Sequence, residues 1–177
     1  CRFAIPPSVL AAASRVPGET PHEQAIAELS PTRVIHAQVG YPMVLAGDPS
    51  RMRLVAGGGT GKFRVFDDRN LEQILEWDGP SGIVAAMAMD NASRIAIATR
   101  EGVLSLRSVN DGSVLSELSK VADAPGSLAF ARDGTCVLIG TRDRSALQWT
   151  IGGSDVTTLA TGLSGLVRAC TPSPNGT

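Results

Sequence analysis

The segment Ala131-Arg-Asp-Gly-Thr-Cys-Val-Leu-Ile-Gly-Thr141 combines a tight-turn signal with a short apolar run. Its Asp-Gly pair favours a two-residue hairpin turn, and the aliphatic and β-branched residues that follow favour a strand. Two other segments superimpose on it, Met89-Asp-Asn-Ala-Ser-Arg-Ile-Ala-Ile-Ala-Thr99 and Asp48-Pro-Ser-Arg-Met-Arg-Leu-Val-Ala-Gly57. Their last residues follow one another at intervals of 42 positions. The same interval separates four turn pairs: Pro49-Ser50, Asn91-Ala92, Asp133-Gly134 and Asn175-Gly176. The chain therefore repeats one structural unit.

Each unit contains four short apolar runs separated by turns rich in Gly, Asp and Asn, which is the pattern of strands and hairpins. The first unit predicts strands at 43–47, 53–57, 62–67 and 73–77. The second predicts strands at 84–89, 94–99, 103–107 and 114–118, and the third at 127–131, 136–141, 146–150 and 156–160. Several runs, such as 95–98, are apolar on both faces, which favours sheets packed between other sheets.

A period of about 40–45 residues that holds four strands is typical of a β-propeller blade. We therefore expect an all-β fold with about four four-stranded blades of about 42 residues each, forming part of a larger propeller. The blades are expected at 43–82, 83–124 and 125–165, with the start of another at 166–177 whose first strand ends at Cys170. The remaining blades would come from the rest of the chain or from a partner.

Residues 1–42 allow two interpretations. The segment 3–14 is a fainter copy of the repeat, which predicts a degenerate blade with strands at 8–14, 24–29 and 33–39. Alternatively, Thr20-Pro21-His22-Glu23 has the form of a helix capping box with proline at the first helical position. In that case 1–42 is a short N-terminal extension that carries a helix.

The repeat resembles the WD40 family. The resemblance is carried by Arg64-Val-Phe-Asp67 and Leu147-Gln-Trp149 at the ends of third strands, and by Ser127-Leu-Ala-Phe-Ala-Arg-Asp-Gly134 as a first strand with its turn. It covers residues 43–177. The sequence departs from the family because every unit lacks the Gly-His pair and the second unit has Arg107-Ser108 in place of a terminal aromatic residue. A propeller of another family is therefore the alternative.

The resemblance implies structural roles for a few residues. Members of the family tie their blades with hydrogen bonds among Trp, Ser or Thr, His and Asp. Of these positions, Trp149, Thr141 and Asp143 match, and no His is available. Phe66 and Asp67 match the family's terminal dipeptide. We treat all five residues as structural.

The composition excludes several classes of function. Sixteen Lys and Arg against 17 Asp and Glu leave a net charge of −1, which disfavours a dedicated nucleic-acid binder. The longest apolar run, residues 83–89, is far shorter than the roughly 20 residues that cross a bilayer, so we expect no membrane insertion. Three widely spaced cysteines without a C-x-x-C pair favour a reducing compartment, hence an intracellular and cytoplasmic location.

Candidate catalytic and metal-binding patterns are weak. The run Ala56-Gly-Gly-Gly-Thr-Gly-Lys62 lacks the Ser or Thr of a phosphate loop and is followed by Phe63, so we interpret it as a turn. The two histidines have no spacing that would close a metal site. We therefore expect no catalytic residue, no cofactor and no enzymatic activity.

Arginine outnumbers lysine 14 to 2, and its planar guanidinium suits interfaces and the binding of carboxylate or phosphate. Arg100, Arg142 and Arg144 fall in equivalent turns between second and third strands, so they would lie on one rim. Trp77, at the end of a fourth strand, is a further candidate, either as an exposed interface anchor or as a cap on the blade edge. The alternative for the arginines is a genome-wide compositional bias.

Together these observations predict a non-catalytic scaffold that holds other proteins of a multi-subunit assembly on its rim. One alternative is a propeller that binds a small ligand or catalyses a reaction in its central channel. Another is an RNA-associated propeller that uses the arginine-rich rim.

Overall fold

The structure is a computed structural model that describes residues 36–41, 44–48, 51–119 and 125–173 of the 177-residue chain. All of these residues belong to one unit, His36–Thr177. Most of the region for which a degenerate blade or a helical extension was expected, residues 1–42, lies outside the described residues. Over the described positions 36–39, where part of a fourth strand was predicted, the chain is irregular.

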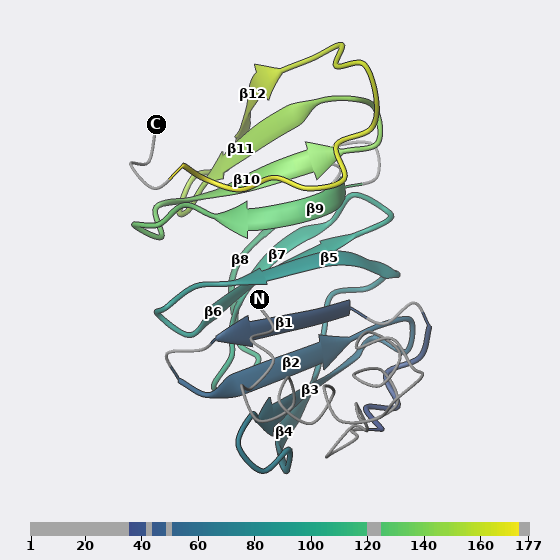
Figure 1. Cartoon of the computed structure of the whole chain (residues 1–177), viewed down its shortest axis with the longest axis vertical. Coiled ribbons are helices and arrows are strands. Elements are labelled where there is room, and N and C mark those ends of the chain that lie inside the picture. The colour runs from purple at the N-terminus through teal and green to yellow at the C-terminus, as the bar shows by residue number, and fades with distance from the viewer. Residues whose placement is uncertain (1–35, 42–43, 49–50, 120–124, 174–177) are drawn as a thin grey trace, which may run out of the picture. The chain divides into compact units, whose positions relative to one another are not determined.

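Twelve strands form three antiparallel sheets, and within each sheet the strands pair in chain order (Figure 1). The first sheet contains β1 (Val44–Asp48), β2 (Arg53–Gly57), β3 (Lys62–Asp67) and β4 (Gln73–Asp78). The second contains β5 (Val84–Met89), β6 (Arg94–Thr99), β7 (Leu104–Ser108) and β8 (Val114–Leu118). The third contains β9 (Pro125–Phe130), β10 (Cys136–Thr141), β11 (Ala146–Thr150) and β12 (Val156–Ala160). The described residues include no helix, and therefore none long and apolar enough to cross a membrane.

The expected all-β class and the division into four-stranded units are therefore confirmed for residues 44–160. The three sheets also share a local irregularity. In each of them the pairing of the third strand with the fourth shifts register once, at Val65/Phe66, at Leu106/Arg107 and at Ala146/Leu147. The shift lies toward the end of the third strand in the first two sheets and at the start of β11 in the third sheet. Such a bulge increases the local twist of the strands.

The apolar cores lie between the sheets. Consecutive residues of β6 face opposite ways, because side chains alternate along a strand: Ile95 and Ile97 join the core with the first sheet, and Ala96 and Ala98 join the core with the third. This explains why β6 is apolar on both faces, and it confirms a sheet packed between two others. The core with the first sheet also contains Val55, Phe63, Val65, Trp77, Val84, Met87 and Val109. The core with the third contains Ala86, Leu104, Leu106, Phe130, Val137, Ile139, Leu147 and Trp149.

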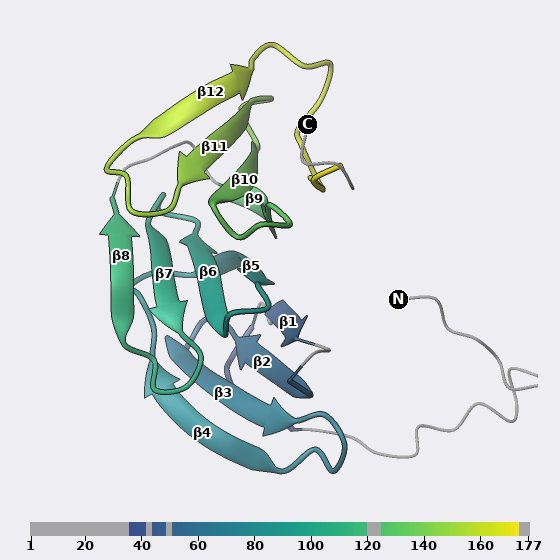
Figure 2. The same cartoon turned by 90° about the vertical axis from the view of Figure 1, so that its left-hand side faces the viewer.

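The first strands of the three sheets lie next to one another. β1 contacts β5 and β5 contacts β9. Figure 2 shows these strands on one side of the unit and the last strands, β4, β8 and β12, on the opposite side. The starts of β5 and β9 therefore lie near the turns that follow the second strands, which is where the candidate site is found.

After β12 the chain returns across the third sheet without forming a strand. The backbone N–H of Leu163 donates to the carbonyl oxygen of Arg144 at 3.1 Å, and the N–H of Val167 donates to the carbonyl oxygen of Thr141 at 3.0 Å. A strand ending at Cys170 was expected here. The described residues 166–173 contain no strand, because isolated bonds of this kind do not make the continuous ladder that defines one.

Candidate functional site

Two arginines occupy the same position in consecutive sheets, directly after the second strand. Arg100 follows Thr99 and Arg142 follows Thr141, and both threonines are fully buried. Each threonine hydroxyl accepts a hydrogen bond from the backbone N–H four residues later, at 3.2 Å from Val103 and 3.1 Å from Ser145. The hydroxyls therefore close the two turns, and they fix the backbone from which each arginine extends.

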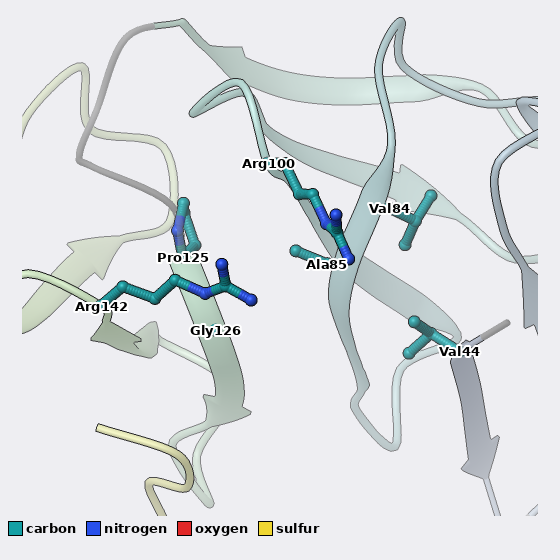
Figure 3. A pocket seen from close by; sticks show the side chains of 7 residues that line it. All are labelled: Val44, Val84, Ala85, Arg100, Pro125, Gly126 and Arg142. Carbon is teal, nitrogen blue, oxygen red and sulfur yellow. The ribbon is translucent and has the colours of Figure 1, made fainter. Parts of the chain in front are cut away.

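The arginine side chains line one pocket. It has a volume of about 120 Å³ and is lined by Val44, Val84, Ala85, Arg100, Pro125, Gly126 and Arg142. Figure 3 shows both guanidinium groups reaching into the same space from different sheets, with Ala85 and Pro125 beside them. The backbone N–H of Arg100 donates to the carbonyl oxygen of Ile83 at 2.8 Å, so the arginine turn is joined to the loop that leads into β5.

Neither Arg100 nor Arg142 forms an ion pair within the part of the chain that the structure describes. Their neighbouring carboxylates are engaged elsewhere. Glu101 accepts a hydrogen bond from the Ile83 backbone N–H at 3.0 Å. Asp143 accepts one from the Thr141 hydroxyl, and this bond is the main reason why the pKa of Asp143 lies below its ordinary value. The pocket thus carries two positive charges that no described residue pairs with.

Arg144 does not share this pocket, although its place in the repeat predicted a common rim. It adopts a left-handed backbone conformation with φ of 69°, and it is exposed but absent from the pocket lining. The structure therefore brings together two of the three predicted arginines.

The expectation that Trp77 is an exposed anchor is wrong. The residue is only 7% exposed, because it lies between the first and second sheets. Its ring stacks on Phe63, with centroids 4.5 Å apart and planes inclined by 3°. Arg107 belongs to β7 of the second sheet, and its guanidinium lies 5.9 Å from the Trp77 ring centroid. Trp77 is therefore part of the core that joins the two sheets.

The residues assigned structural roles by resemblance are only partly connected. Thr141 and Asp143 are hydrogen-bonded, but the Trp149 indole N–H donates to the carbonyl oxygen of Gly153 at 3.3 Å. Trp149 and Phe66 are both buried in the sheets, and Asp67 forms a salt bridge with Arg69 at 3.2 Å. The structure thus contains a two-residue link in the third sheet instead of a network that includes Trp149.

A second hollow of about 250 Å³ adjoins the pocket and shares Val44, Ala85 and Gly126 with it. It follows the first strands β5 and β9, and its far side is formed by the returning segment with Arg168, Ala169 and Cys170. Arg168 was not predicted from the sequence as a residue of this site. Its only signal in the sequence is its position near the start of the expected fourth unit, which does not reveal that the chain folds back over the third sheet.

The chemistry available at the site is the binding of an anion. The ionisable side chains that line the pocket are arginines, which donate hydrogen bonds and do not act as general bases at neutral pH. Among the residues that the structure describes, no group of three His, Cys, Asp or Glu side chains is placed to hold a metal ion.

Comparisons with known proteins describe the fold only. No family model matches the sequence, and no curated protein matches it significantly. A solved structure, "Kuenenia stuttgartiensis Hydrazine Synthase", resembles it with a TM-score of 0.68 at 15% sequence identity. The match covers 83% of this chain and 43% of that one, so this chain spans less than half the length of its structural neighbour. At this identity the likeness shows a shared fold.

Proposed function

We propose that this chain is part of a non-catalytic β-propeller of the WD40-like kind, and that it binds other proteins through the face that carries Arg100 and Arg142. We call this surface the loop face and define it by the residues that line the pocket. The observation that carries the proposal is the presence of two guanidinium groups, unpaired among the described residues, that are directed into one pocket between the sheets.

The propeller part of the proposal is supported by the repeat. The sheets follow one another at 42 residues, each has four strands in chain order, and their first strands lie side by side. Propellers close with about 4–8 such blades. The three described sheets would therefore be consecutive blades of a larger ring, whose other blades come from elsewhere in the chain or from a partner.

The binding part of the proposal is supported by the composition of the loop face. Arginine is enriched in protein interfaces and lysine is depleted. Here, two arginines flank apolar side chains such as Val84 and Pro125, so the surface offers both a hydrophobic contact and charge recognition. An intracellular setting is part of the proposal, because Cys136 and Cys170 are free thiols and reducing compartments keep thiols unpaired.

The test is partner capture with a blocked loop face. Ala85 lines both hollows, so Ala85→Trp should fill them while leaving the arginines in place. The matched control is Val114→Trp on the outer strand β8, where the residue is 54% exposed. The full chain is tagged in its own cells, and the proteins recovered with each variant are compared quantitatively.

We expect A85W to lose specific partners that the wild-type chain and V114W both retain. Equal recovery with all three chains would show that the loop face is not the binding surface. Thermal melts of the three purified proteins establish that A85W is folded, so that a loss of capture is not attributed to unfolding.

A further inference from the structure

We infer that the loop face recognises carboxylate groups, and that its ligand is an extended acidic peptide segment of the partner protein. This inference rests on the proposed function and specifies its ligand. Arg100 and Arg142 would bind the acidic side chains, and the adjoining hollow along β5 and β9 would receive the rest of the segment.

The first argument is the unbalanced charge of the pocket. Two like charges that line one small pocket repel each other, and an anion between them removes that repulsion. The nearest carboxylates in sequence are directed to other groups, since Glu101 accepts a hydrogen bond from the Ile83 N–H and Asp143 accepts one from the Thr141 hydroxyl. Among the residues that the structure describes, none supplies the counterion, and a carboxylate of a bound partner would take that place.

The second argument is the fixed position of the two arginines. The buried threonine before each arginine closes the turn. The Arg100 N–H is bound to Ile83, and the carbonyl oxygen of Thr141 accepts the Val167 N–H at 3.0 Å. A guanidinium held on such a backbone can present two parallel N–H groups to one carboxylate, which gives directional recognition.

The third argument is the length and lining of the hollow. Three residues are common to both cavities, so the pocket continues along the first strands as far as Arg168. The lining between the cationic ends consists of small and apolar residues, among them Ala86, Met87 and Leu128. In an extended chain alternate side chains project to the same side, so a segment with acidic residues at alternate positions matches these features.

The described surface favours a peptide over a nucleic acid. Single-stranded nucleic acid is bound largely by stacking its bases on aromatic side chains. No aromatic residue lines either hollow, and the chain has a net charge of −1 where a nucleic-acid binder is usually basic.

The experiment measures binding of a defined probe to the full 177-residue chain by fluorescence anisotropy. The probe is a fluorescein-labelled octapeptide of alternating Glu and Ala. Two further ligands are measured in parallel: the same peptide with Gln in place of Glu, and a labelled twelve-residue oligouridylate. The protein variants are Arg100→Gln, Arg142→Gln and the matched control Arg144→Gln, which makes the same charge change in the turn that carries Arg142 but outside the pocket lining.

We expect the wild-type chain to bind the Glu peptide and not the Gln peptide. R100Q and R142Q should each raise its Kd about tenfold, because each removes a charge-assisted hydrogen-bonding partner. R144Q should change it by less than about twofold, as expected for an exposed charge outside the site. Arg142→Lys, which keeps the charge but loses the planar fork, should fall between R142Q and wild type.

Three outcomes would overturn the inference: no binding of the Glu peptide by the wild-type chain, equal binding of the Gln peptide, or equal losses in R144Q and R142Q. Tighter binding of oligouridylate, weakened by the same two variants, would assign the pocket to phosphate instead. If A85W abolishes partner capture but R100Q and R142Q do not affect the Glu peptide, the loop face remains the binding surface and only its proposed ligand class is wrong.

Discussion

At the scale of single residues, Gly112 shows how closely the first two sheets fit. Its backbone is left-handed, with φ of 73°, and a Cβ atom added there would lie 2.4 Å from Cγ of Trp77. We predict that Gly112→Ala destabilises the protein by about 1–3 kcal/mol, as overpacking of a well-packed core does. The measurement is the midpoint of urea unfolding.

The control for this prediction is Gly152→Ala. Gly152 has a similar φ of 85° but no atom within 4 Å of the added Cβ. It therefore reports the conformational cost of the left-handed backbone alone, about 1 kcal/mol. If the two variants unfold at the same urea concentration, the added Cβ at position 112 has no cost against Trp77 beyond that of the left-handed backbone.

The burial of Arg107 is a residue-scale feature that the sequence did not predict. The second unit has Arg107 where an aromatic residue was expected, and that departure alone does not predict burial. In the structure Arg107 is 8% exposed, and its Nη1 donates to the carbonyl oxygens of Asp78 at 2.8 Å and Gly112 at 3.2 Å. Asp78 ends strand β4 of the first sheet and Gly112 lies in the turn between β7 and β8 of the second, so the role of Arg107 depends on packing that no local pattern encodes.

At the scale of elements, strand positions were predicted well because Gly, Asp and Asn mark the turns. The strands at 53–57, 94–99 and 136–141 have the expected bounds. Other ends differ by one or two residues because pairing decides them. β4 extends to Asp78, which pairs with Lys62, and β7 begins after Val103, whose N–H is bound to the Thr99 hydroxyl in the turn.

The turn between β9 and β10 carries a prediction about pH. The backbone N–H and the hydroxyl of Thr135 both donate to the Asp133 carboxylate. These bonds, the backbone one contributing more, lower the pKa of Asp133 in the folded state. A group with a lowered folded-state pKa adds stability above its ordinary pKa, and this stability is lost as the pH falls through the lowered value. Asp133→Asn should therefore make unfolding less sensitive to acid than in the wild type.

The predicted acid dependence is tested by measuring the urea midpoints of the wild type and D133N from neutral pH into the acid range. The difference in urea midpoint between the two proteins should be constant above the ordinary pKa of aspartate and should shrink below it. Thr135→Ala removes only the hydroxyl donor and should give an intermediate dependence. A difference that does not vary with pH would show that the turn does not stabilise the charged carboxylate.

The strand β10 should be sensitive to cavity formation on the face that packs against the second sheet. Ile139 is 1% exposed within that core, so Ile139→Ala should cost about 2–5 kcal/mol of unfolding free energy. Leu159→Ala on the outer strand β12, where the residue is 53% exposed, should change it by less than about 0.5 kcal/mol. Similar losses in both variants would mean that β12 is covered in solution.

At the scale of the whole molecule, the pocket lay beyond sequence-based prediction. The repeat placed Arg100 and Arg142 in equivalent turns, and the structure brings both to one pocket. The remaining walls come from Val44, Val84 and Pro125, each the first residue of a different sheet. Their approach depends on how far each sheet is rotated relative to the next, a property of the inter-sheet cores that a 42-residue period does not contain.

The same cores predict how stability is distributed over the molecule. The second sheet packs against a neighbour on both faces, and β6 contributes buried residues to both cores, whereas the first and third sheets each share one core within the described residues. In repeat architectures stability is approximately a sum of intrinsic terms and nearest-neighbour interfaces. We therefore predict that the amides of β6 and β7 exchange hydrogen most slowly, when native-state exchange is followed by mass spectrometry.

Two core variants make this prediction specific. Ile97→Ala weakens the core between the first and second sheets, and it should accelerate exchange in β2 and β3 more than in β10 and β11. Ile139→Ala weakens the other core and should give the reverse pattern. Equal acceleration of all twelve strands in both variants would mean that the three sheets open only together. The nearest-neighbour account would then fail, because each interface would report the stability of the entire unit instead of its own.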